Sequence, residues 1–253
     1  MIPTSLLTAI LFNLILSIAL PMGIMLWLRR RGGRWPAFFA GAAAFVLFAM
    51  VLEQALHYLV LQSPLGGTIQ ENIWLYALYG GLAAGLFEET GRLAAFKLLL
   101  KKQTRPVTAL SYGAGYGGME AFLILGLTMV NNLAILFAYT GGGQLPAELE
   151  GAAATLLATP ATLFLLGGFE RVAAIVFHIA NSVLVFAAAR CPGKLWLFPL
   201  AIVTHMLVDF IAVTANAFFT PAITELAVSI FTVLAALLAA KVYGNLRETA
   251  ENT

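Results

Sequence analysis

Two adjacent glutamates and an arginine lie in the middle of a long apolar run, in the stretch GLFEETGRLAAF at residues 85–96. Arg92 follows Glu88 by four residues and Glu89 by three, so on a helix its guanidinium can reach back to both carboxylates. Adjacent helical residues point about 100° apart, so one glutamate can pair with Arg92 while the other faces elsewhere. A desolvated carboxylate beside a like charge favours its protonated form. The stretch therefore predicts a group that takes up and returns protons, as a general base does.

The three histidines of the chain also lie in apolar segments, each with a polar partner one helical turn away. The pairs are His57 with Glu53, His178 with Asn181 and Ser182, and His205 with Asp209. Imidazoles opposite a glutamate can hold a water or stabilise an oxyanion, which is the inventory of amide hydrolysis by an activated water. The sequence contains no GxSxG or HExxH motif, and no serine is paired with a lysine, so the serine-type and common zinc-peptidase signatures are absent.

Membrane-spanning helices must position these residues. The 253 residues are 61% hydrophobic and 10% charged, with a mean hydropathy of +0.91, unlike a soluble domain. The net charge of +2 and the scattered basic residues do not suggest nucleic acid as a partner. A crossing needs about 20 apolar residues, and the candidates are 4–28, 36–60, 73–100, 107–139, 169–189, 195–217 and 222–243. We predict an all-α polytopic transmembrane bundle that forms one integral membrane domain, 1–253, with a catalytic core at about 73–217.

Basic residues set the expected orientation, because arginine and lysine prefer the cytoplasmic side. They occupy the loops after the first, third and fifth crossings and the C-terminal tail, whereas the loops at 62–72 and 141–151 carry only acids. This alternation predicts seven crossings with the N-terminus outside and the C-terminus in the cytoplasm. The apolar segment 152–168 contains Pro160, and we predict a re-entrant or surface helix there. A split of 107–139 into two helices would give eight crossings instead.

Several ionisable residues fall at one depth when helical residues are spaced by ~1.5 Å. They lie near the midplane on four separate crossings and are Glu88, Glu89, Glu120, His178 and His205. A charge at the bilayer centre costs roughly 2.5–3.5 kcal/mol, so a shared polar cavity is the economical explanation.

A purely structural interpretation stays open for some of the polar residues. Glu53 and His57 could join helices through an interhelical hydrogen bond. Glu120 follows Gly113 and Gly117, whose GxxxG spacing favours close helix packing, so its carboxylate could be docked on a neighbouring helix. Glu170 and Arg171 begin the fifth crossing and could form an ion pair near the interface.

The motifs EETGR, FHIAN and HMLVD stand in three separate predicted crossings and resemble those of the intramembrane glutamate-protease superfamily. That group includes the CAAX-processing endopeptidases and the PrsW-like proteases. The chain is most similar to the YhfC branch, described as intramembrane metalloproteases, which also fits the glycine-rich GYGGME. The resemblance covers about residues 85–210, and it implies an intramembrane endopeptidase of the prokaryotic plasma membrane.

The resemblance also implies roles for individual residues. Glu88 and Glu89 match the motif that supplies the water-activating base, although Arg92 follows one residue sooner than in the family pattern EExxxR. Which of the two glutamates faces the water stays open. His178 and His205 match the histidines of the second and third motifs. Supporting residues are Arg92, Glu120 and Asn181.

Asp209 stands where the CAAX proteases carry asparagine, and this leaves two mechanisms open. In the first, which family analogy favours, no cofactor is needed: a glutamate deprotonates water, and His205 with Asp209 stabilises the oxyanion. In the second, zinc held by His178, His205, Glu89 and Asp209 polarises the water. The implied partners are the bilayer and a membrane-embedded or lipidated peptide substrate. A proton-coupled or small-solute transporter, or a non-proteolytic scaffold or chaperone with the same cavity, is the alternative function.

Overall fold

The computed structural model describes residues 2–141 and 146–251, and these form helices and connections without a strand. The prediction of an all-α chain is confirmed. The helices are α1 (Thr4–Arg29), α2 (Trp35–Ala44), α3 (Gln54–Leu61), α4 (Gly66–Glu71), α5 (Ile73–Ala94), α6 (Val107–Glu120), α7 (Leu127–Thr140), α8 (Ala147–Ala158), α9 (Ala161–Arg190), α10 (Leu197–Phe218) and α11 (Pro221–Glu251). Three π-helical stretches, η1 (Phe45–Glu53), η2 (Ala95–Leu99) and η3 (Ala121–Gly126), continue α2, α5 and α6.

Six helical segments of the described chain are long and apolar enough to cross a membrane. They are Thr4–Arg29, Trp35–Leu61, Val107–Thr140, Ala161–Arg190, Leu197–Phe218 and Pro221–Glu248. The helix formed by α5 and η2, residues 73–99, is about 40 Å long at ~1.5 Å per residue, which is also enough to span a bilayer. It carries four charged residues, so it is not among the six segments that qualify as membrane spans by both length and apolar composition. The count of seven crossings therefore stays a prediction.

The structure decides the alternative left open at 107–139 and corrects the prediction for 152–168. The helix Val107–Thr140 is continuous through η3, so the alternative split that would give an eighth crossing does not occur. The segment 152–168 is not one re-entrant helix, because α8 ends at Ala158 and α9 begins at Ala161. Pro160 explains the break: it forces the preceding residue, Thr159, into extended backbone (φ −75°, ψ 125°). The second half of the segment thus lengthens α9 instead of forming a separate element.

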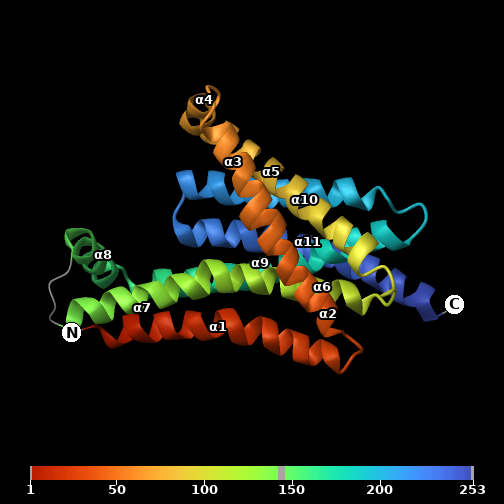
Figure 1. The fold of residues 1–253 in the computed structure, drawn as a ribbon, viewed down its shortest axis with the longest axis horizontal. Helices are drawn as coiled ribbons and strands as arrows, with labels where there is room; N and C mark the ends of the chain where they lie inside the picture. Colours follow the sequence, from red (N-terminus) through yellow and green to blue (C-terminus); the bar gives the residue numbers. More distant parts are fainter. Residues whose placement is uncertain (1, 142–145, 252–253) are drawn as a thin grey trace.

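Most of the long helices run along the long axis of the molecule (Figure 1). The connections at 30–34, 100–106 and 191–196 and the C-terminal part of α11 gather at one end of this axis, whereas α8 and the start of α1 lie at the other. The predicted basic loops therefore share one end of the bundle. The side of the membrane that this end faces stays a prediction.

Glycines let α6 pack closely between α2 and α9. A Cβ atom on Gly115 would overlap the carbonyl oxygen of Phe38 in α2. On the opposite side, Cβ atoms on Gly113 and Gly117 would lie 2.5 Å and 2.9 Å from the Cα atoms of Ile179 and Ile175 in α9. The close packing predicted from the GxxxG spacing is confirmed, and it brings α6 against the part of α9 that carries His178.

Replacement of Gly115 by alanine is expected to lower the free energy of unfolding by about 1–3 kcal/mol, because the new methyl group meets backbone that cannot rotate away. Gly23 is the matched control, since a Cβ atom there meets no heavy atom within 4 Å. Gly23→Ala should be neutral or slightly stabilising, as expected for a glycine inside a helix. Thermal unfolding of both variants in detergent checks this. Equal midpoints for the two variants would contradict the close approach of α2 and α6.

Candidate functional site

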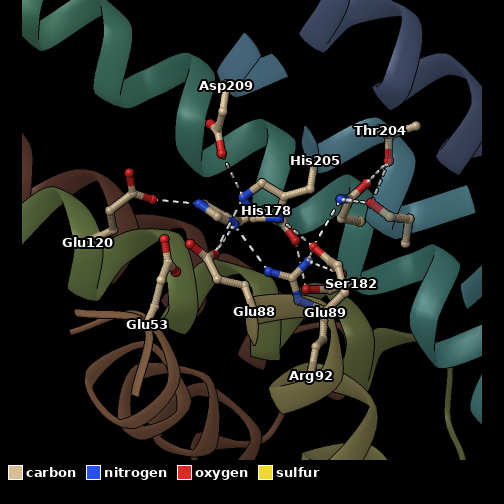
Figure 2. A network of polar contacts seen from close by, with 12 residues as sticks. Glu53, Glu88, Glu89, Arg92, Glu120, His178, Ser182, Thr204, His205 and Asp209 are labelled. Atoms are coloured by element: carbon tan, nitrogen blue, oxygen red, sulfur yellow. Dashed lines mark hydrogen bonds and ion pairs between the residues drawn. The ribbon is translucent and has the colours of Figure 1, made fainter. Parts of the chain in front are cut away.

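Glu89, on α5, is the centre of a buried polar network (Figure 2). Arg92 Nη1 donates to both of its carboxylate oxygens at 2.8 Å. Asn181 Nδ2 on α9 donates to Glu89 Oε1 at 3.0 Å, and His205 Nδ1 on α10 lies 2.7 Å from the same oxygen. Glu89 and Arg92 are fully buried, with 0% exposure. Of the two adjacent glutamates, Glu89 is therefore the one that pairs with the arginine.

The approach of α10 to Glu89 depends on two glycines of α5. Gly81 and Gly85 precede Glu89 by two turns and one turn, so all three lie on the same face of the helix. A Cβ atom on Gly81 or Gly85 would lie 2.5 Å or 2.7 Å from the carbonyl oxygens of Met206 and Ile202 in α10. Larger residues at these positions would push α10 away, and His205 would no longer reach Glu89.

Glu88 faces a different side of α5 and lines a small cavity of about 110 Å³. Its Oε2 atom is buried and has no hydrogen-bond partner among the described residues. That oxygen lies 3.6 Å from His205 Nε2 and 3.9 Å from His178 Nδ1, which is beyond hydrogen-bond distance. The cavity is polar and roomy enough for a few waters. Glu88 therefore presents a free carboxylate oxygen to a space in which water fits.

His178 bridges the two charged parts of the network. Arg92 Nη2 lies 3.1 Å from His178 Nδ1, and because a guanidinium only donates, Nδ1 is the acceptor. The proton of the neutral ring is then on Nε2, which lies 2.5 Å from Glu120 Oε2. Arg171 Nη1 also donates to Glu120, at 2.5 Å. Glu120 is thus docked on the neighbouring helix α9, as the structural interpretation of this residue predicted. Its partners there are His178 and Arg171.

Asp209 and Glu53 complete the acidic surroundings of His205. Asp209 Oδ2 is 3.8 Å from His205 Nε2, and its side chain is 38% exposed. The buried carboxylate of Glu53, on η1, points toward the same region as Glu88 (Figure 2). Glu53 was not among the predicted site residues. The sequence signal was the spacing of four residues between Glu53 and His57, and His57 Nε2 does lie 3.2 Å from Glu53 Oε1. This spacing alone did not distinguish a site residue from one that joins two helices through a hydrogen bond.

The structure brings together all the residues for which a catalytic or supporting role was predicted. They are Glu88, Glu89, Arg92, Glu120, His178, Asn181, His205 and Asp209. The ion pair expected between Glu170 and Arg171 is also present. Arg171 is shared, however, because it also binds Glu120 and thereby joins the end of the network.

The four predicted metal ligands are not arranged as one ligand set. Glu89 and His178 use their donor atoms for Arg92 and for neighbouring groups, and the described part of the chain has no group of three or more His, Cys, Asp or Glu placed to hold a metal ion. The free donors are His205 Nε2, Glu88 Oε2 and Asp209 Oδ2, a nitrogen and two oxygens of the kind that zinc accepts. The site also holds more carboxylates than arginines: Glu53, Glu88, Glu89, Glu120 and Asp209 against Arg92 and Arg171. His205, Glu88 and Asp209 suit a divalent cation by donor type and charge, but in the described part of the chain they are not placed as a ready ligand set.

A family model described as YhfC intramembrane metalloprotease matches residues 16–231. The chain belongs to this family. An uncharacterized membrane protein YhfC of Bacillus subtilis (strain 168) is 34% identical over 235 residues, which cover 88% of this chain and 89% of that protein. No solved structure is significantly similar to the chain. The YhfC resemblance predicted from the motifs is confirmed, and the protein is a multi-pass integral membrane protein of a family named for intramembrane proteolysis.

Proposed function

We propose that this YhfC family member is an intramembrane endopeptidase in which Glu88 activates the water that attacks the peptide bond. The observation that carries this proposal is the buried, unpartnered Oε2 atom of Glu88 beside a cavity in which water fits, 3.6 Å from His205 Nε2. The description of the family as intramembrane proteases supports the reaction class. Glu88 removes a proton from water and later delivers it to the amine leaving group, as a general base and then a general acid.

His205 is the group that stabilises the oxyanion in this mechanism. Its Nδ1–H donates to Glu89, which fixes the ring so that Nε2 faces the cavity. In the doubly protonated form, Nε2–H donates to the oxygen of the tetrahedral intermediate, and the negative charge of Glu89 balances the imidazolium. Asp209, 3.8 Å from Nε2, adds a carboxylate on the exposed side. Arg92 holds this arrangement from outside the cavity, whereas His178 and Glu120 line the cavity beside Glu88.

A metal-dependent variant would use the same cavity. A bound metal ion supplies Lewis acidity that makes its water a stronger acid, and His205, Glu88 and Asp209 are the residues that would hold it. Chelator treatment and metal analysis of the purified protein separate the two variants. In the glutamate mechanism we expect cleavage to persist after exhaustive chelation, with less than one metal ion for every ten chains. Loss of cleavage that zinc restores would contradict it.

Substrate access is provided by a larger cavity of about 400 Å³ next to the catalytic one. Asp209 and Ala212 line both cavities, so the two adjoin. The larger one lies between α3, α5 and α10, and Gly80 leaves its wall open, because a Cβ atom there meets no atom within 4 Å. We infer that a peptide segment enters here and reaches Glu88 past Asp209.

The test is incubation of the purified protein with transmembrane and lipidated peptides, with the products identified by mass spectrometry. His205→Ala is expected to lower the cleavage rate by about 10²–10³-fold, the usual loss when one oxyanion donor is removed. Glu170→Gln is the comparison variant at the rim of the same cavity, because this carboxylate is 41% exposed and pairs with Arg171. Unchanged cleavage in His205→Ala would remove this histidine from the mechanism. No cleavage of any peptide by the wild type would favour the transporter or scaffold alternatives.

A further inference from the structure

A further cavity lies far from the carboxylate network, at the end of the bundle where the basic loops gather (Figure 1). It has a volume of about 510 Å³ and lies between the end of α1, the start of α6 and α11. Three arginines from these three parts of the chain line it, and no acidic residue is among the described residues that do so. They are Arg31, Arg105 and Arg247. The cavity therefore concentrates positive charge around a space that can hold a ligand.

Two of these arginines are held in place by their neighbours. The guanidinium carbon of Arg31 lies 3.9 Å from the ring centroid of Trp27, a cation–π contact. The guanidinium of Arg105 lies against the backbone of Gly32, where a Cβ atom would overlap it. Gly32 has φ +92°, a conformation that side chains disfavour, so the backbone at this position favours glycine. Within the described chain, neither arginine forms an ion pair with a carboxylate.

An apolar groove of about 300 Å³ continues from this cavity toward the middle of the bundle. Leu110 and Tyr243 line both the cavity and the groove, so the two spaces adjoin. The rest of the groove consists of aliphatic residues of α9 and α11, among them Val176, Val183 and Ala240. Its lining is almost wholly apolar, so it suits a hydrocarbon chain and not a second polar group.

We propose that this cavity and groove together bind one anionic phospholipid. Arg31 and Arg105 bind its phosphate, since guanidinium groups match phosphate oxygens in bidentate geometry. One acyl chain lies in the groove between α9 and α11. A free phosphate offers the same headgroup chemistry, but it leaves the groove without an occupant, and the groove is what favours the lipid. This site is separate from the catalytic cavity, and lipid binding here does not depend on whether the protein cleaves peptides.

The test measures binding of phosphatidylglycerol to the full-length protein in detergent by native mass spectrometry, with phosphatidylcholine and inorganic phosphate as comparison ligands. Removing two basic residues at a membrane surface is expected to weaken binding of the anionic lipid roughly 25-fold, at about fivefold per residue. The variant is Arg31→Gln with Arg105→Gln. Its matched control is Arg30→Gln with Lys101→Gln, which removes the same charge at the same end from residues that do not line the cavity. The control should bind phosphatidylglycerol as the wild type does.

A second variant tests the groove. Ala240→Phe places a ring in the groove from an exposed position, so the helix core is not disturbed. It is expected to weaken phosphatidylglycerol binding at least fivefold and to leave binding of inorganic phosphate unchanged. An equal loss in the charge control would overturn the proposal in favour of general surface attraction. Phosphate that binds as tightly as the lipid, together with no effect of Ala240→Phe, would overturn it in favour of a bare anion site.

Discussion

Replacement of Glu88 by glutamine is expected to lower the peptide cleavage rate by about 10²–10⁴-fold, the range for loss of a general base, while the protein stays folded. Glutamine has the same shape but cannot accept a proton from water. The fold should tolerate the change because Glu88 Oε2 has no hydrogen-bond partner to lose among the described residues. The measurement is single-turnover cleavage of a transmembrane peptide, with the thermal midpoint in detergent recorded for the same sample.

The adjacent Glu89 is the informative comparison for Glu88→Gln. Glu89→Gln removes a charge that Arg92, Asn181 and His205 all contact, so both activity and stability should fall. Both variants replace a glutamate by a glutamine, and the two positions are adjacent in the chain. If Glu88→Gln cleaves normally and Glu89→Gln is inactive but fully stable, the roles assigned to the two glutamates are reversed.

Replacement of Arg92 by methionine is expected to lower the free energy of unfolding by about 3–5 kcal/mol, the cost of leaving one partner of a buried ion pair without the other. Arg92 is fully buried and donates to both oxygens of Glu89 and to His178 Nδ1. Methionine fills similar volume but donates nothing. Reversible unfolding in mixed micelles measures the change. Arg30→Met, an exposed residue of the first basic loop, is the control and should be neutral.

A double variant separates the buried charge from a general loss of packing. If the cost arises from the unpaired carboxylate, Glu89→Gln combined with Arg92→Met should be less destabilised than the sum of the two single variants. The shared network predicts a coupling energy of about 0.5–3 kcal/mol between the two positions. Additive effects would mean that Arg92 stabilises the protein through packing alone.

The convergence of the polar residues could be predicted because lipid leaves ionisable groups few alternatives. Glu88, His178 and His205 lie at one depth in separate apolar segments, and a charge there is costly unless it is shared with partners from other helices. Arg92 was likewise predictable as the partner of a neighbouring glutamate, since helical spacing brings residues i and i+3 together. These are properties of single helices and of the solvent around them, so the sequence alone contains them.

Helix boundaries were less predictable where apolar composition does not change. The segment around Pro160 is apolar on both sides, so hydropathy could not show that α9 begins at Ala161 and not at 169. The break follows from the backbone restriction that proline imposes on the residue before it. The π-helical stretch η3 bridges α6 and α7 without a break, although the length of the segment had allowed a split into two helices.

From its sequence alone, this protein is a membrane-embedded bundle with acids and imidazoles in its interior, because the periodicity of a helix and the cost of charge in lipid are local constraints. Tertiary structure decided which glutamate is engaged and which is free: Asn181 and His205 reach Glu89 from two other helices, and Glu88 is left facing the cavity. It also placed Glu53 at the site and put three arginines around one cavity. These outcomes depend on how the helices are packed and rotated against one another, which is set by contacts between residues far apart in the chain.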